Sequence, residues 1–155
     1  MRWPFRSKAE PTAVPLPTVT LTDEEHQECE SFLRSIVPKS EGGAWYMPVE
    51  LVEPFQRSMT AYFLIERANR FLILRQPAEA CKVAMKAWVI YPLSVYVYDC
   101  ACVLESAGNP AEAKLMFAEF LRRHKLGPLN NALDEITMRR RDLDSMVQEA
   151  LRKTS

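Results

Sequence analysis

Side chains able to support catalysis or metal binding are few and widely separated in this chain. The only histidines are His26 and His124, which we expect in different helices, whereas a catalytic or metal-binding constellation needs several such groups close together. The acidic run LTDEEHQE at residues 21–28 is typical of a capped, solvated helix start. We therefore expect no catalytic residue, no metal site and no cofactor, and a protein that is not an enzyme.

The cysteines and glycines also lack the spacing of a reactive site. Cys29, Cys81, Cys100 and Cys102 lie in apolar, helical-looking stretches rather than in the loops of a disulfide framework. On a helix, Cys100 and Cys102 diverge by about 200°, and no second pair completes a zinc site. The four glycines form no phosphate-binding loop, and the motifs G-x-S-x-G and H-E-x-x-H do not occur. We expect buried free thiols in a reducing, intracellular compartment.

The composition is that of one ordinary globular domain. The chain has 155 residues, of which 48% are hydrophobic and 26% charged, and Lys plus Arg equals Asp plus Glu at 20 each. This neutrality argues against nucleic acid or an acidic membrane surface as a partner. The longest apolar run, from Leu93 to Leu104, is interrupted by Asp99 and is shorter than the ~20 residues that cross a bilayer, so we expect no transmembrane segment.

Residues 1–20 are predicted to form an extended, proline-rich arm. Prolines at positions 4, 11, 15 and 17 fix φ and remove backbone donors. Trp3, Phe5 and Leu16 would anchor such an arm on a partner, with a disordered terminus as the alternative. Three basic residues precede the first acidic one, as in a mitochondrial address, but the prolines oppose the amphipathic helix of a transit peptide. We expect a cytoplasmic protein, with the mitochondrion as the alternative.

Local signals divide the rest of the chain into six helices within one domain over residues 21–153. Thr22 and Glu25 form a capping box, which predicts a helix from Thr22 that Pro38 ends. Pro54 suits the first turn of the next helix. Prolines and other breakers separate the remaining helices, which are predicted at about 54–76, 77–91, 93–107, 109–125 and 131–152.

The segment 93–107 is ambiguous, because its alternating and β-branched residues are also typical of a strand. Helices predicted on both sides would leave a lone strand without a partner. Ser94 can cap a helix here, and Gly108 stands where a helix C-terminus favours positive φ. We therefore predict a helix that is buried on most of its faces.

An internal repeat connects four of these helices. Residues 75–88, RQPAEACKVAMKAW, correspond to residues 108–121, GNPAEAKLMFAEFL. In each copy a helix ends, the chain turns, and a helix begins whose alanines allow close antiparallel packing. The repeat predicts two helical hairpins, at about 61–93 and 94–126.

The two hairpins resemble the tetratricopeptide repeat (TPR) family, whose pattern of about 34 residues has small residues at positions 8, 20 and 27, an aromatic at 11 and proline at 32. Counted from Ala61, the first copy matches at Ala68, Phe71, Ala80, Ala87 and Pro92, and the second copy, counted from Ser94, matches more loosely. Arg67 departs from the usual apolar residue at position 7 and Phe120 from the small residue at 27. The resemblance covers residues 61–126 and implies an all-α, right-handed array, with the helices 22–37 and 131–152 as caps at both ends.

The resemblance also implies a binding face at positions 2, 5, 9 and 12 of the first helix in each copy. These positions hold Tyr62, Ile65, Asn69, Leu72, Val95, Tyr98, Cys102 and Glu105. Only Asn69 matches a carboxylate-binding position of the family, so an apolar groove for an amphipathic helix or an extended segment is expected instead. The occupant could be a partner, the chain's own arm or its last helix, and the alternative is that these residues are simply core.

These observations predict a non-catalytic protein-protein interaction scaffold, an adaptor or accessory subunit of a larger multi-protein complex. The alternative is an RNA-contacting helical-repeat protein in a ribonucleoprotein assembly, using the basic clusters at residues 122–125 and 139–141. Acidic residues lie near both clusters in the sequence, so we expect exposed, salt-bridged faces there.

Overall fold

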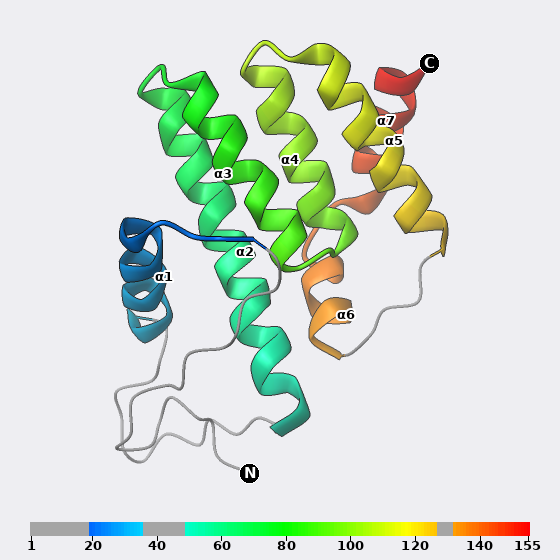
Figure 1. Ribbon diagram of the computed structural model, residues 1–155. Helices are drawn as coiled ribbons and strands as arrows, with labels where there is room; N and C mark the ends of the chain where they lie inside the picture. The colour runs from blue at the N-terminus through cyan, green and yellow to red at the C-terminus, as the bar shows by residue number, and fades with distance from the viewer. Residues whose placement is uncertain (1–18, 36–48, 127–131) are drawn as a thin grey trace.

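The computed structural model describes residues 19–35, 49–126 and 132–155, and all regular secondary structure in these ranges is α-helical (Figure 1). The helices are α1 Asp23–Ser35, α2 Val49–Ile73, α3 Pro77–Ile90, α4 Ser94–Ser106, α5 Pro110–Leu126, α6 Ala132–Arg139 and α7 Leu143–Thr154. The predicted all-α fold class is confirmed for this part of the chain. The arm with Trp3, Phe5 and Leu16 and the helix end at Pro38 lie outside the described residues.

The helices form a row of two antiparallel pairs, α2 with α3 and α4 with α5 (Figure 1). α4 contacts both α3 and α2, so the second pair packs against both helices of the first. α1 packs against α2 at one end of the row, and α7 packs against α5 at the other. α6 lies against the N-terminal part of α2, where Leu133 of α6 and Phe55 of α2 belong to the same small hydrophobic cluster. The ambiguous segment 93–107 therefore forms helix α4, as predicted, in the middle of the row.

Small side chains in the first pair and aromatic side chains in the second fill the core. In α2 and α3 the fully buried residues include Ala61, Ala68, Ala80, Ala84 and Ala87. Because alanine adds little volume, the axes of these two helices can approach closely. In α5, Phe117 and Phe120 are buried and pack edge-on against Tyr98 of α4. Among the described helices, none is both long and apolar enough to span a membrane.

The turns inside the two pairs have the same backbone structure, at equivalent positions of the repeat. Arg75 and Gly108 both have positive φ, at 59° and 88°. The hydrogen bonds that close the two turns also correspond. In the first turn Gln76 N donates to Phe71 O (2.8 Å) and Arg75 N to Leu72 O (3.0 Å). In the second turn Asn109 N donates to Leu104 O (2.9 Å) and Gly108 N to Glu105 O (3.1 Å). Pro77 and Pro110 then begin α3 and α5, where the missing N–H costs nothing. The sequence repeat is thus a repeat of backbone geometry at these turns.

The predicted capping box at the start of α1 is confirmed. The backbone N–H of Glu25 donates to Thr22 Oγ1 (3.1 Å), and the N–H of Thr22 donates to Glu25 Oε1 (2.8 Å). The predicted cap of α4 is wrong, because its N-cap residue is Leu93 and Ser94 is the first helical residue. The Ser94 hydroxyl is instead buried, 3.6 Å from Met138 Sδ of α6.

Two other predicted helix boundaries are wrong. α2 begins at Val49, so Pro54 lies inside the helix, one turn beyond its expected position. The last segment was expected to be one helix over 131–152, but α6 ends at Arg139 and α7 begins at Leu143. Asp142 caps α7 by accepting a hydrogen bond from the N–H of Ser145 (3.1 Å). An aspartate that satisfies this N–H favours a new helix start over continuation of the old helix.

Candidate functional site

The eight residues of the predicted binding face lie on neighbouring helices, four on α2 and four on α4, which run in the same direction (Figure 1). Ile65 and Val95 are 6% and 0% exposed, so both belong to the core. The other six are at least partly accessible and are called here the α2–α4 face: Tyr62, Asn69 and Leu72 on α2, and Tyr98, Cys102 and Glu105 on α4. The two halves of this face differ in what lies next to them.

The α4 half of the face contacts the chain's own last helix, α7. Lys153 Nζ lies 2.6 Å from Glu105 Oε2, and both side chains are about one third exposed. The apolar side of α7, with Met146 and Ala150 buried, packs into the core beside α5. An amphipathic helix of this chain therefore contacts the predicted binding face at Glu105.

Burial and nearby negative charge shape the electrostatics of this half. Burial raises the pKa of Tyr98 to about 12, with additional effects of Cys102 and of Glu149 on α7. Burial and the charge of Asp99 raise the pKa of Cys102 to about 11. Both groups are neutral at physiological pH, so this half offers an apolar surface with one carboxylate, Glu105, which Lys153 neutralises.

The α2 half of the face is more open. Tyr62 is 45% exposed, and its ring lies 6.1 Å from the ring of Phe32 in α1. Asn69 is exposed two turns further along α2, and Leu72 is partly buried at the end of the same side. The amide of Asn69 can both donate to and accept from the main chain of a peptide, while Tyr62 offers an apolar ring with a polar tip. This half therefore presents an exposed amide and an exposed aromatic ring on the same side of α2.

A partly buried ion pair fixes the segment between α6 and α7 onto α4. Arg141 donates to both carboxylate oxygens of Asp99, at 2.6 and 3.0 Å, and the Asp99 side chain is only 18% exposed. Such two-point pairing sets the orientation of both groups. It therefore places the start of α7 relative to the α4 half of the face.

Arginines of both basic clusters form salt bridges, as predicted from the sequence. Arg122 and Arg123 both pair with Glu119, and Arg139 pairs with Glu135. Hydrogen bonds from Arg122 lower the pKa of Glu119, burial raises it in part, and hydrogen bonds from Arg123 lower it further, so that the pKa is about 2. These arginines are thus partly neutralised within their own helices.

Sequence reasoning missed a charged interface between α1 and the α2–α3 pair. Arg67, Arg70 and Lys86 lie there opposite glutamates of α1. The only signal in the sequence was Arg67, which occupies a position that the tetratricopeptide pattern keeps apolar. The Asp99–Arg141 pair was also missed, because no local pattern connects residues 42 positions apart.

The described residues hold no group of three or more side chains able to bind a metal ion. All four cysteines are free: Cys29 and Cys100 are buried, and Cys81 and Cys102 are partly buried. His26 is exposed on α1 and His124 partly buried on α5.

Comparisons with protein-family models, with curated proteins and with solved structures find no match.

Proposed function

We propose that this chain is a non-catalytic scaffold for protein-protein interaction, an adaptor or accessory subunit of a larger complex. In this proposal the pairs α2–α3 and α4–α5 form a short, right-handed tetratricopeptide-like array, with α1 and the C-terminal helices as its caps. The α2 half of the α2–α4 face binds an amphipathic helix or an extended segment of a partner protein.

The observation that carries this proposal is the position of α7. It is an amphipathic helix that packs against α5 and reaches the α4 half of the face through the Lys153–Glu105 ion pair, whereas Tyr62 and Asn69 on the α2 half remain exposed. Because α2 and α4 are equivalent helices of the repeat, a segment of a partner could contact the exposed side chains of α2 much as Lys153 of α7 contacts Glu105 of α4. Tyr62 would contact an apolar side chain of that segment, and Asn69 would bind its main chain or a polar side chain.

The alternative of RNA contact has less support. Arg122, Arg123 and Arg139 already pair with carboxylates, and forming a contact with phosphate would require breaking those pairs. The formal net charge is zero, so no long-range field attracts a polyanion. Peptide binding requires neither the breaking of these ion pairs nor a net positive charge.

The test compares two substitutions to the same large, charged side chain on different faces. Asn69→Arg blocks the open half of the α2–α4 face, whereas Leu115→Arg alters the outer side of α5, where Leu115 is 70% exposed. The tagged wild-type chain and both variants are expressed at endogenous level, purified by affinity and analysed by quantitative mass spectrometry.

We expect a defined protein partner that co-purifies with the wild type and with Leu115→Arg but is reduced at least about tenfold with Asn69→Arg. Equal recovery with both variants would show that the α2–α4 face is not the binding surface. Recovery of RNA, with binding that falls steeply as salt is raised, would favour the alternative function.

A further inference from the structure

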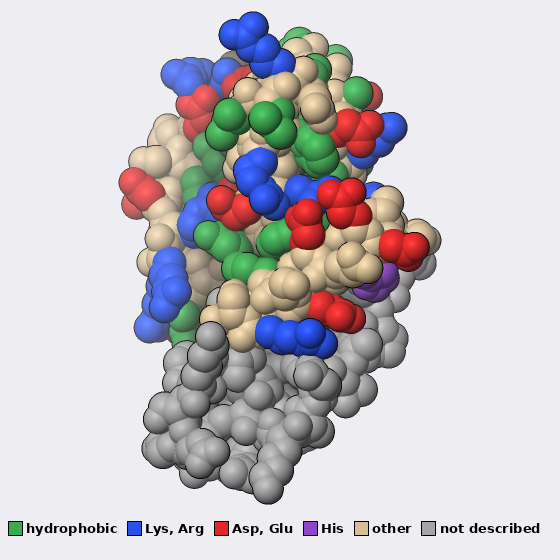
Figure 2. Space-filling model, turned by 90° about the vertical axis from the view of Figure 1, so that its left-hand side faces the viewer, with side chains coloured by type: hydrophobic (Ala, Val, Ile, Leu, Met, Phe, Trp, Pro, Cys, Tyr) green, Lys and Arg blue, Asp and Glu red, His purple; other side chains and the backbone are tan. Residues whose placement is uncertain are grey.

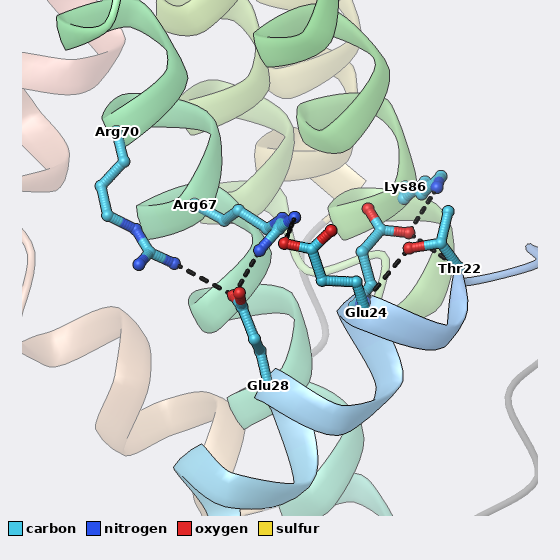
Figure 3. Close-up of polar contacts among 7 residues, drawn as sticks. Thr22, Glu24, Glu28, Arg67, Arg70 and Lys86 are labelled. Atoms are coloured by element: carbon cyan, nitrogen blue, oxygen red, sulfur yellow. Dashed lines mark hydrogen bonds and ion pairs between the residues drawn. The ribbon is translucent and has the colours of Figure 1, made fainter.

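Helix α1 contacts the α2–α3 pair through a set of charged side chains (Figure 3) and through the ring of Phe32. We call the surface beneath it the α1-binding surface, formed by Phe63, Arg67 and Arg70 of α2 and Lys86 of α3. Glu24 and Glu28 of α1 pair with Arg67, and Glu28 also lies 3.6 Å from Arg70. Glu25 Oε1 lies 2.6 Å from Lys86 Nζ, and the rings of Phe32 and Phe63 are 5.4 Å apart. Three carboxylates and one ring of α1 thus each have a matching group on the surface.

This surface requires an acidic occupant. The Arg67 side chain is only 11% exposed, and a charge buried to that extent is costly unless it is paired. The guanidinium also lies over the ring of Phe71, 5.2 Å from its centroid, which holds it in place without neutralising it. A carboxylate from a covering helix is therefore the group that compensates Arg67.

α1 meets this requirement incompletely. Arg67 Nε is buried and has no hydrogen-bond acceptor among the described residues. Glu24 is 71% exposed and Arg70 58% exposed, so these parts of the interface are screened by solvent. Figure 2 looks onto this side of the molecule and shows acidic and basic side chains intermixed there, with hydrophobic side chains between them.

The apolar contribution of α1 is also small. Within α1 only Glu25 and Cys29 are buried, and Phe32 and Leu33 are partly exposed. A helix of 13 residues is marginal in water without tertiary contacts. A partner helix with the same charges and a larger apolar side could therefore compete with α1 for this surface.

We propose that the α1-binding surface is a docking site for an acidic amphipathic helix of a partner protein, and that α1 is its internal occupant. The positions of Glu24, Glu25, Glu28 and Phe32 define what the partner helix must present: carboxylates at positions n, n+1 and n+4, and an aromatic residue at n+8. This site adjoins the α2–α4 face at Tyr62, whose ring lies 6.1 Å from that of Phe32. It is regulated by the chain itself, because α1 must leave before a partner binds.

The test uses a fluorescein-labelled synthetic peptide with the sequence of residues 20–35 as the probe. Its affinity for the full-length chain is measured by fluorescence anisotropy. In the variant Glu24→Lys/Glu28→Lys, the protein's own α1 is repelled by Arg67 and Arg70. The control Asp23→Lys/Glu30→Lys makes the same change in net charge on the same helix, but Asp23 is exposed and Glu30 pairs with Arg34 of α1 itself.

We expect Glu24→Lys/Glu28→Lys to bind the peptide at least about tenfold more tightly than the wild type, and the control to bind it like the wild type. A peptide with glutamine in place of all three interface glutamates should lose at least about tenfold in affinity for the same variant. Circular dichroism checks the fold, and if the lysine variant unfolds, Glu24→Gln/Glu28→Gln should show a smaller rise in the same direction.

Three results would overturn the proposal. The first is equal affinity of the two charge-reversal variants, which would mean that α1 does not limit access. The second is equal binding of the glutamine peptide, which would mean that the surface does not select acidic helices. The third is a wild-type dimer that exchanges α1 between copies, detected by light scattering, because the occupant would then be a second copy of this chain.

Discussion

Replacing Phe120 with alanine tests the packing of the second helix pair against what the repeat alone suggests. Phe120 occupies the position in the second copy of the repeat that Ala87 has in the first, and both side chains are 0% exposed. If the repeat pattern determined stability, alanine at position 120 would be neutral or favourable. The structure predicts the opposite, because the Phe120 ring packs edge-on against Tyr98, with centroids 5.2 Å apart.

The expected magnitude follows from this complete burial. Truncating a fully buried phenylalanine to alanine costs about 3–5 kcal/mol, since apolar burial is lost and a cavity remains. Part of this loss, about 1 kcal/mol, is the contact with the Tyr98 ring. For a chain of this size the melting temperature should fall by roughly 10 °C. The reciprocal change Ala87→Phe adds a ring where no space exists and should cost about 1–3 kcal/mol.

The assay is unfolding by urea and by heat, followed by circular dichroism. Leu115→Ala on the same helix is the control, because Leu115 is 70% exposed and its truncation should change the free energy of unfolding by less than about 0.5 kcal/mol. A Phe120→Ala protein as stable as the wild type would refute the packing of α5 against α4. A tolerated Ala87→Phe would refute the close approach of α2 and α3.

Three further predictions concern an interface carboxylate, the turns and the thiols. Burial raises the pKa of Glu25, but hydrogen bonds from Lys86 and from the Thr22 N–H lower it more, so that the pKa in the folded protein lies below the ordinary value of 4.5. Ionised Glu25 therefore stabilises the fold above about pH 4.5. This contribution is lost as the pH falls through the pKa of the folded state. Glu25→Gln should cost about 1–3 kcal/mol at pH 7 in urea unfolding, and the difference from the wild type should shrink toward pH 3; a constant difference would contradict this. In the same assay Arg75→Gly should stabilise the protein by about 0.5 kcal/mol and Gly108→Ala should destabilise it by about 1 kcal/mol, because both positions have positive φ. An added Cβ at Gly108 meets no atom within 4 Å, so the cost there comes from the backbone conformation alone. The opposite signs would show that the turns relax. Burial raises the pKa of both Cys29 and Cys100 to about 12. Iodoacetamide at pH 8 should therefore modify these thiols in urea but not in the native protein, as measured by mass spectrometry. Rapid labelling of either thiol in the native protein would show that α1 or α4 opens.

Most helix starts and turns were predictable because their causes are local. The capping box of Thr22 and Glu25 acts within a single helical turn, and Pro77 and Pro110 act at single positions. The two turns repeat because each needs one residue with positive φ, which Gly108 adopts freely and Arg75 adopts at some cost. The fold class and both helix pairs follow from such signals together with the alanine pattern.

The incorrect boundaries have causes elsewhere in the fold. Ser94 does not cap α4, because its hydroxyl is buried against Met138 of α6. The last segment divides into α6 and α7 where Arg141 pairs with Asp99, far away in the sequence. Local periodicity supports one continuous helix there, but a partly buried ion pair and a new N-cap at Asp142 stabilise the break.

The sequence by itself determined that the described part of this chain is all-α, where most of its helices begin, and that two of its turns share one geometry. Only the tertiary structure decided that Ile65 and Val95 belong to the core, that Lys153 of α7 pairs with Glu105 of the α2–α4 face, and that Arg67 is paired with α1. The physical reason is distance along the chain. Caps and turns act between near neighbours in the sequence, whereas the Arg67–Glu28 contact joins residues 39 positions apart, and which groups meet at such separations depends on how the helices pack.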